Sequence, residues 1–429
     1  MNTITSDFLE AKRLITDPLA DNVVAEIISS GYEQSINDVF MKLVRNNSYS
    51  PDVFKGLPDK VYTLITNYFE ESGKLPDWAD PDLIVEGEKV FSQFGPEIFM
   101  LLNVKSLPLC YSCAKGSKVL YDTGRLTEHN GKIDPLARRL METAQMVMDV
   151  LHTGGLAPGG SGIITMQKVR LIHASIRYFL KNEKINKSGE PWDVATYGEP
   201  INQEDLTGTL MSFAPVILSG LKQLNIELTE SQIDAYSHCW KVVGHMMGIN
   251  DDLLPDTYQE GWELAAAILK DQAAESMEGQ ALTASCVDFM KYIIPGNLLE
   301  SVPEYLIWYF MQDVNEAVGK NLTDFIGIEN HESKKDQFIV TITRFFTGEF
   351  SHFDHSKVVQ KLTEKFNKVL LHAFLKHYND GKRVHFLIPP SLQKDWNLVE
   401  EWQDQFAVTP SIFGNRLMFQ KKNKATLKK

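Results

Sequence analysis

The 429-residue sequence lacks an excess of basic charge, because 43 lysine and arginine residues face 56 aspartate and glutamate residues, for a formal net charge of −13. Binding to nucleic-acid phosphates requires a basic face, so this balance argues against a nucleic-acid partner. One dense basic run, residues 421–429, is more typical of a solvated tail than of a membrane-surface anchor.

Long apolar runs are also missing. Outside the glycine-rich residues 153–162, the longest uncharged run covers residues 206–221 and contains Pro215. It is shorter than the roughly 20 apolar residues that a membrane span needs. Acidic residues interrupt the N-terminal segment where a secretion signal would be apolar. We therefore expect no transmembrane segment and a cytoplasmic protein.

Cysteine is scarce, with four residues in the chain. Cys110 and Cys113 form a C-x-x-C pair, which is typical of redox sites and of half a zinc site. Zinc needs a second pair, whereas Cys239 and Cys286 are isolated, and the strand-to-helix context of a thioredoxin motif is absent. The small number of cysteines thus fits a reducing compartment, and the sequence assigns them no functional role.

What the chain does contain is helical periodicity. With 43% hydrophobic residues it can bury one large core or two smaller ones. Apolar residues recur every three to four positions over most of its length, which predicts an all-α fold. The clearest helices are expected at residues 22–30, 58–71, 134–152, 165–181, 204–224, 229–248 and 259–276. Residues 383–388 alone resemble a short strand.

One histidine stands between two arginines on a predicted helical face. Arg170 precedes His173 by three residues and Arg177 follows it by four, so all three project from nearly the same side. An imidazole can ligate iron, while guanidinium groups can pair with the propionate carboxylates of a porphyrin. The competing interpretation is a hydrogen-bonded core histidine.

Arg139, Glu142 and Thr143 share a face of the preceding predicted helix. The glycine-rich loop between the two helices lacks the Gly-Lys-Ser/Thr end of a phosphate-binding loop. Thr143 and His173 each lie ten residues from this loop, about 15 Å along their helices. If the helices are antiparallel, a flat cofactor fits between them. Alternatively, Arg139 and Glu142 form a solvated ion pair.

Together these motifs resemble the catalytic domain of the rubber oxygenases (latex-clearing proteins) and the related MpaB-type oxygenases over roughly residues 17–255. The ordered motifs are Arg139-x-x-Glu-Thr143, Gly154-Gly-Leu-x-Pro-Gly-Gly160, Lys168-Val-Arg-Leu-Ile-His-Ala-x-x-Arg177, Gly198-x-Pro-Ile-Asn-Gln-Glu-Asp-Leu206 and Trp240-x-Val-Val-Gly-His245. The resemblance implies haem b in a globin-like helical core, with His173 as the proximal ligand. It also implies that Arg139 and Thr143 form the distal polar pair, with additional N- and C-terminal helices around the core.

One position departs from the rubber-cleaving members, where a lysine precedes the distal threonine and this chain has Glu142. A carboxylate cannot donate a hydrogen bond as an ammonium does, so this position does not support polyisoprene as the substrate. Glu142 can instead act as a base that removes an allylic proton. We expect a haem-dependent, dioxygenase-like oxidoreductase acting with dioxygen on an apolar, isoprenoid-like molecule by cleavage of a carbon–carbon double bond. Arg170 and Arg177 are the candidate propionate partners.

Several alternatives remain open. His238 and His245, with Asp251 and Asp252 beyond them, suggest a non-haem metal site, although two helical turns separate the imidazoles by about 10 Å. The chain can also be a haem- or lipid-binding sensor or carrier without turnover, or a cofactor-free helical interaction protein.

The remaining expectations concern organisation. The Asn202-Gln-Glu-Asp205 tetrad is typical of a helix start capped by Asn202, with Asp205 bonding back to its backbone. Histidines at positions 352, 355, 372, 377 and 385 are interpreted as surface residues. We expect an N-terminal helical region (1–90), a haem-binding core (91–255) and a C-terminal helical region (256–429), the last either separate or continuous with the core.

Overall fold

The computed structural model describes residues 4–32, 35, 39, 42, 49–123, 134–182, 190–293 and 302–332, without the side chains of residues 134–139, 141, 292 and 293. Regular secondary structure within these ranges is helical, with one isolated bridge between Cys113 and Ala273. The predicted all-α class is therefore confirmed. In the same ranges no helix is both long and apolar enough to cross a bilayer. The expected strand at 383–388, the histidines from position 352 onward and the basic run lie outside the described residues.

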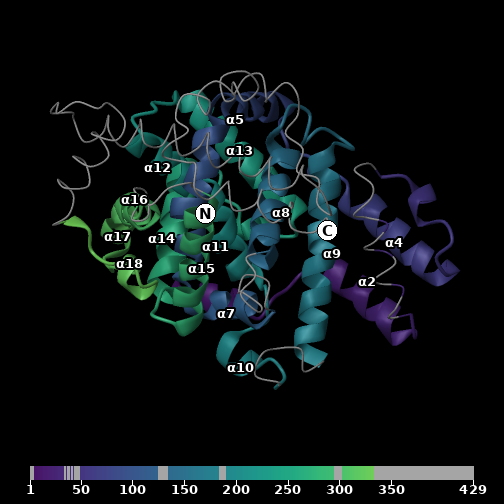
Figure 1. Ribbon diagram of the computed structural model, residues 1–429. Coiled ribbons are helices and arrows are strands. Elements are labelled where there is room, and N and C mark those ends of the chain that lie inside the picture. The colour runs from purple at the N-terminus through teal and green to yellow at the C-terminus, as the bar shows by residue number, and fades with distance from the viewer. Residues whose placement is uncertain are drawn as a thin grey trace, which may run out of the picture.

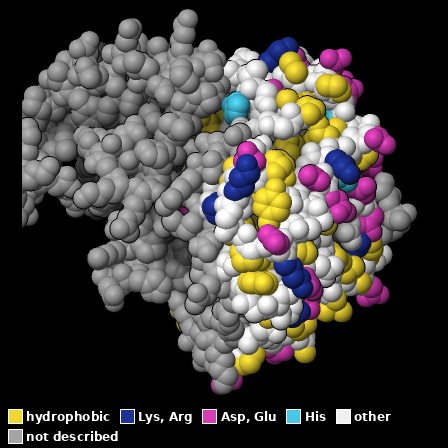
Figure 2. Space-filling view, turned by 90° about the vertical axis from the view of Figure 1, so that its right-hand side faces the viewer, with side chains coloured by type: hydrophobic (Ala, Val, Ile, Leu, Met, Phe, Trp, Pro, Cys, Tyr) yellow, Lys and Arg dark blue, Asp and Glu magenta, His cyan; other side chains and the backbone are white. Residues whose placement is uncertain are grey.

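The elements that follow α1 (Ser6–Lys12) form one edge of the molecule. They are α2 (Pro18–Ser29), the 3-10 turn η1 (Pro51–Phe54) and α4 (Asp59–Ser72). Buried residues of α2 and α4 pack with one face of α9 (Ser161–Asn182) in a separate small core. Figure 1 shows α2 and α4 beyond α9, at the edge opposite α16–α18. Figure 2 views this edge, where apolar side chains lie among charged ones of both signs.

The central helix α5 (Pro81–Leu101) starts with proline at its first position and is kinked at Phe94, two residues before an internal proline. It continues into the π-helix η2 (Leu102–Ser106), α6 (Leu107–Tyr111) and α7 (Ala114–Asp122). Along α5 packs α13 (Glu230–Met246). A Cβ at Gly87 would lie 2.6 Å from the Ala235 carbonyl oxygen and 2.5 Å from Cys239 Sγ, so glycine permits this close approach.

The remaining helices complete the main core. They are α8 (Asp134–Leu151), α10 (Val194–Tyr197), α11 (Gln203–Phe213), α12 (Pro215–Gln223), the 3-10 turn η3 (Asp251–Leu253), α14 (Tyr258–Gln272), α15 (Met277–Ile293), α16 (Val302–Phe310), α17 (Gln312–Val318) and α18 (Leu322–Phe325). One apolar cluster joins residues from Leu9 to Ile328. Helix α9 contributes Ile163 and Met166 to this cluster and its opposite face to the small core. Its two faces thus belong to two cores.

Most predicted helices are present with ends shifted by a few residues, but the single helix expected at 204–224 is wrong. The chain leaves the helical conformation at Ala214 (φ −99°, ψ −92°), and α12 restarts at Pro215. Proline removes one backbone donor and disfavours helical geometry in the residue before it. The division at residues 90 and 255 stays a prediction; α5 passes through the first of these positions.

Candidate functional site

Helices α8 and α9 form an antiparallel hairpin whose register is defined by side-chain bonds. Thr165 Oγ1 donates to Asp149 Oδ2 at 2.7 Å, and nearer the loop His152 Nε2 lies 2.7 Å from Ser161 Oγ. Ser161 Oγ also donates to the Asp149 carbonyl at 3.2 Å. The two helices lie side by side in Figure 1. Residues before Asp149 therefore face residues after Thr165.

The glycine-rich turn holds the two helix ends together by backbone contact. A Cβ at Gly155 would lie 2.4 Å from the Asp149 carbonyl oxygen, and one at Gly162 would lie 2.7 Å from Val150 Cα. A Cβ at Gly160 would meet the Gly154 and Gly155 carbonyl oxygens at 2.5 Å each. Side chains at these positions would force the hairpin apart. The loop predicted from glycine content is confirmed, and the contacts explain why glycine is needed.

The buried carboxylate of Glu88, on α5, binds this turn. Glu88 Oε2 accepts the Gly154 N–H at 2.9 Å, and Oε1 accepts the Leu156 N–H at 3.4 Å. Burial raises the pKa of Glu88, while these amide bonds act in the opposite direction. Sequence reasoning missed this residue because its partners lie more than sixty positions away and no local motif marks it.

Helical geometry directs Thr143 and His173 to the same side of the hairpin. At about 100° per residue, Thr143 and Val150 lie on one side of the stripe that contains Asp149. By the same count, His173 and Met166 lie on the corresponding side of α9. Val150 and Met166 are both buried in the main core, which identifies this side as the interior. The predicted juxtaposition of the threonine and histidine positions is thus compatible with the hairpin.

Three members of the predicted site are partly buried. Glu142, Thr143 and His173 are neither fully exposed nor sealed in the core, and each has further interactions. Glu142 lies seven residues before Asp149, on the stripe that faces α9. Arg139 lies on α8, one turn before Thr143, but its side chain is outside the described residues.

The two arginines of α9 are bound to α2. Arg170 Nε and Nη2 donate to both carboxylate oxygens of Asp17 at 2.8 and 2.7 Å, and both side chains are buried. Arg177 Nε donates to Asp21 Oδ1 at 2.7 Å, and its Nη1 donates to the Ile201 carbonyl at 3.1 Å. These contacts favour a role in holding α9 against α2. The pairing of either arginine with a propionate stays a prediction that no contact supports.

The rival metal site is not assembled. His238 Nε2 accepts the Asp80 N–H at 2.9 Å, which uses its lone pair, and His245 Nδ1 lies 2.8 Å from Asp251 Oδ1. Trp78 lies edge-on to both imidazoles, with ring centroids 6.0 and 5.6 Å away. Throughout the described part of the chain, no three histidine, cysteine or acidic side chains are grouped as a metal ion requires.

This donor set fits haem better than a bare ion. Haem brings four nitrogen ligands of its own and needs one axial imidazole from the protein. His173 is partly buried, and Glu142 and Thr143 stand on the facing helix at nearly the same level. The residues present therefore meet the chemical requirement, although the arginine contacts provide no propionate partner.

The C-x-x-C pair lies among buried polar groups. Cys110 Sγ donates to Ser212 Oγ at 3.3 Å, and all four cysteines are free thiols. Burial raises the pKa of both Cys110 and Cys113, so both thiols are protonated at neutral pH. This state disfavours a nucleophilic role.

The Asn202–Asp205 tetrad caps the start of α11, as predicted. Asn202 Oδ1 accepts the Asp205 N–H at 2.9 Å. The expected return bond is different, because Asp205 Oδ2 accepts from the Asn202 side-chain amide at 2.9 Å rather than from its backbone. Arg13 Nη1 donates to Glu204 and Asp205 at 3.0 and 2.9 Å, a long-range partner that the spacing did not reveal.

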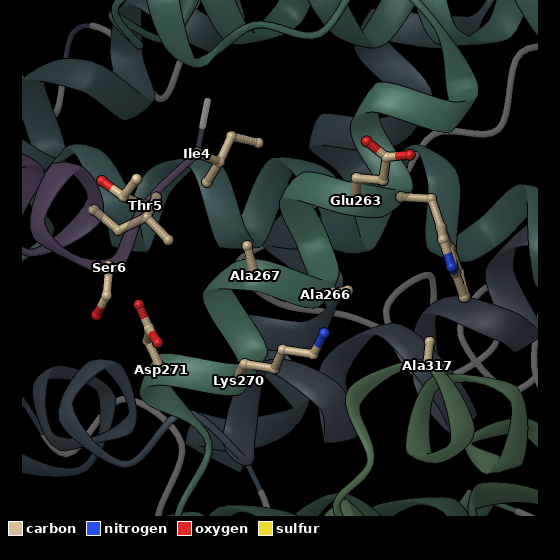
Figure 3. A pocket seen from close by; sticks show the side chains of 11 residues that line it. Ile4, Thr5, Ser6, Glu263, Ala266, Ala267, Lys270, Asp271 and Ala317 are labelled. Carbon is tan, nitrogen blue, oxygen red and sulfur yellow. The ribbon is translucent and has the colours of Figure 1, made fainter. Parts of the chain in front are cut away.

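A cavity of about 500 Å³ opens between α1, α14 and α17. None of the predicted site residues lines it. Figure 3 shows the charged ends of Glu263, Lys270 and Asp271 on its walls, with small alanine side chains between them. The lining includes no residue of α8 or α9, so the cavity is separate from the α8/α9 hairpin site.

Comparisons with known proteins agree on one family. Residues 115–340, more than half of the chain, match the family described as ER-bound oxygenase mpaB/B'/Rubber oxygenase, catalytic domain. A rubber oxygenase from Streptomyces sp. (strain K30) is 26% identical over 271 residues, which cover 63% of this chain and 62% of that protein. The solved structure of a latex clearing protein in the closed state is similar in fold, with a TM-score of 0.65 and 22% identity over 88% of this chain and 95% of that one.

Proposed function

The chain belongs to the catalytic-domain family of the MpaB-type and rubber oxygenases, and from this membership we propose that it is a haem b-dependent oxygenase acting with dioxygen on an apolar alkene. The observation that carries the proposal is the α8/α9 hairpin, which brings a partly buried histidine and a Glu-Thr pair to one level. An isoprenoid-like substrate cleaved at a carbon–carbon double bond is the finer part of the proposal.

His173 is the residue that would hold the haem iron, because its helix presents one imidazole toward the core. Haem b supplies the redox chemistry with dioxygen when it is bound. The apolar residues around the hairpin exclude water and bind the hydrocarbon. Arg139 and the Thr143 hydroxyl would donate hydrogen bonds that orient an oxygen-containing reactant near the haem.

Glu142 would supply a base. Its carboxylate can accept the proton from a carbon next to the double bond, a step that general base catalysis accelerates by about 100-fold or more. Family members with lysine at this position would lack such an acceptor, since an ammonium has no free lone pair. The substitution thus directs the chemistry rather than merely the binding of substrate.

The first test is an absorption spectrum of the purified protein. Wild type is expected to show a Soret band, and His173→Ala is expected to lose it because the variant lacks the proposed imidazole ligand. His238→Ala is the matched control, since that histidine is also partly buried but is bound to Asp80. A colourless wild-type protein, or a band that survives in His173→Ala, contradicts the proposal.

The second test separates turnover from binding. Oxygen consumption is measured with a short polyisoprene oligomer in wild type and in Glu142→Gln. The variant should keep its haem content and lose about 100-fold in rate if the carboxylate takes a proton. Full turnover in Glu142→Gln removes the base assignment. Haem binding without oxygen consumption favours instead a sensor or carrier.

A further inference from the structure

Asp149 accepts hydrogen bonds through both carboxylate oxygens and its main-chain carbonyl, and it joins α8 to α9. Its Oδ2 accepts from Thr165 Oγ1 at 2.7 Å, and its Oδ1 accepts from Gln145 Nε2 at 2.7 Å. Its main-chain carbonyl accepts from Ser161 Oγ at 3.2 Å. Two of these three bonds cross to the other helix.

Desolvation of the Asp149 carboxylate makes the loss of these hydrogen bonds costly. Desolvation raises the pKa of Asp149, while the bonds from Thr165 and Gln145 and the nearby positive charge of Lys168 favour the ionised form. Asp149 is partly buried, and a desolvated carboxylate that loses its donors is costly, so these donors must stay in place. A slide of α9 by one residue moves Thr165 by about 1.5 Å, which is enough to break a hydrogen bond of normal length.

The same register sets the level of the proposed site. Eight residues before Asp149 is position 141, and eight residues after Thr165 is His173, so these two positions lie at the same level along the antiparallel hairpin. Glu142 and Thr143 then lie about 1.5 and 3 Å from the level of His173 along the helix axis. A register change of one residue would alter both offsets.

We propose that Asp149 is a positioning residue that fixes the axial register of α8 against α9 and thereby the offset of Glu142 and Thr143 from His173. The proposal rests on the proposed function, in which His173 would hold the haem while Glu142 and Thr143 would act on the bound reactants. Asp149 acts through Thr165 and Gln145 and touches neither substrate nor cofactor. A misplacement of about 1 Å at a reacting centre can lower turnover by about 100-fold.

The test uses substitutions that differ in what they leave behind. Thr165→Val removes one hydroxyl from the seam at nearly constant shape, and Asp149→Ala removes the acceptor altogether. Asp149→Asn keeps an acceptor for Thr165, and its amide can donate to Gln145 after that side chain rotates. The conservative variant should therefore rescue what the alanine variant loses.

Ser72→Ala is the matched control. Ser72 Oγ accepts from Gln167 Nε2 at 2.7 Å, so this variant also removes one hydroxyl bond to α9. That bond lies on the face of α9 that packs against α4, away from the seam. A general loss of packing around α9 would affect Ser72→Ala and Thr165→Val alike.

Two measurements are made on each variant. In haem-free protein, amide hydrogen exchange is compared for residues 140–148 and 166–176. In haem-loaded protein, the iron–CO stretching frequency and the turnover rate are recorded. Thr165→Val and Asp149→Ala should exchange faster, shift the frequency and lose up to about 100-fold in turnover, whereas Asp149→Asn and Ser72→Ala should match wild type.

Each outcome has a distinct meaning. Thr165→Val and Asp149→Ala variants that match Ser72→Ala in exchange and frequency overturn the positioning role. A frequency shift in Asp149→Asn as large as that in Asp149→Ala also overturns it, because the bonds would not be the cause. A wild-type protein without a haem spectrum contradicts the proposed function, and the exchange measurement then still decides whether Asp149 fixes the hairpin.

Discussion

At the scale of single residues, the arginines beside His173 show how one pattern serves two purposes. A guanidinium on a half-apolar helix needs a carboxylate, and the sequence pattern is the same whether the carboxylate belongs to a cofactor or to a distant aspartate. Here Arg170 reaches Asp17, which is 153 positions away. Asp17 and Asp21 are four residues apart and the two arginines are seven apart, so only the packed helices reveal the two pairings.

The bidentate pair of Arg170 and Asp17 should be a strong determinant of stability. Asp17→Ala leaves a buried guanidinium without its partner, which typically costs about 3–5 kcal/mol. Urea unfolding of Asp17→Ala, Arg170→Met and the double variant measures this cost. The double variant is expected to be more stable than the sum of the two single losses predicts. A loss in Asp17→Ala below about 1 kcal/mol would mean that the pair behaves like an exposed ion pair.

Residues within one helix could be predicted well from sequence, and residues that meet across helices could not. The shared level of Glu142, Thr143 and His173 follows from counting along two helices and a loop. Glu88 and Asp149 were missed for different reasons. Glu88 binds a turn far along the chain, whereas Asp149 lies seven residues after Glu142 on one stripe and was open to detection.

At the scale of elements, the hairpin depends on where glycine is placed. The prediction of a loop required only glycine content, but the contacts divide the glycines into two classes. Gly154 has φ +81° and no atom within 4 Å of an added Cβ. Gly162 has backbone atoms of both neighbouring segments within 2.8 Å of an added Cβ. The first position needs conformational freedom, and the second needs space.

Substitutions at these two positions should therefore differ in kind. Gly154→Ala should lower the free energy of unfolding by about 1–2 kcal/mol, because alanine disfavours the left-handed backbone conformation. It should leave the helices unchanged. Gly162→Ala forces α8 and α9 apart, which costs about 1–3 kcal/mol as overpacking and should also speed amide exchange in both helices. Thermal unfolding and exchange rates on the two variants check this. Similar exchange in both would contradict the assignment of space to Gly162.

The helices themselves were predicted unevenly. Periodicity located α4, α8, α9, α13 and α14, whose apolar residues recur every three to four positions. It did not separate α11 from α12, because the apolar residues continue across Ala214 while the backbone breaks there. Helix α5 was not predicted, because it is buried on several sides and carries an internal proline. Neither an apolar stripe nor its composition therefore marks it as a helix.

At the scale of the whole molecule, a buried charge cluster joins distant parts of the chain. Arg13, just after α1, lies between Glu204 and Asp205 at the start of α11, and it also donates to the Tyr197 carbonyl at 2.7 Å. Two carboxylates thus share one guanidinium. Burial raises the pKa of both acids despite the arginine, and that of Glu204 reaches about 7.

This cluster predicts how stability responds to pH. Glu204 is fully buried, and its pKa is about 7 in the folded protein, compared with an ordinary value of 4.5. Between these values the folded protein holds a proton that the unfolded chain releases, so folding is favoured at low pH. This contribution is complete below about pH 4.5 and is lost as pH rises through about 7. Its full size is about 3 kcal/mol, at about 1.4 kcal/mol per pKa unit.

Glu204→Gln isolates this effect because glutamine stays neutral at every pH. Its free energy of unfolding, measured in urea, should rise relative to that of wild type as pH increases from about 4.5 to 8. Glu10→Gln is the control. The Lys115 ammonium and the Gln272 amide outweigh the opposing desolvation and lower the pKa of Glu10, so its carboxylate stabilises the fold at higher pH and this contribution is lost on acidification. The two variants should therefore deviate from wild type in opposite directions, and parallel pH profiles for Glu204→Gln and wild type would show that the Glu204 carboxyl is ionised across this whole range.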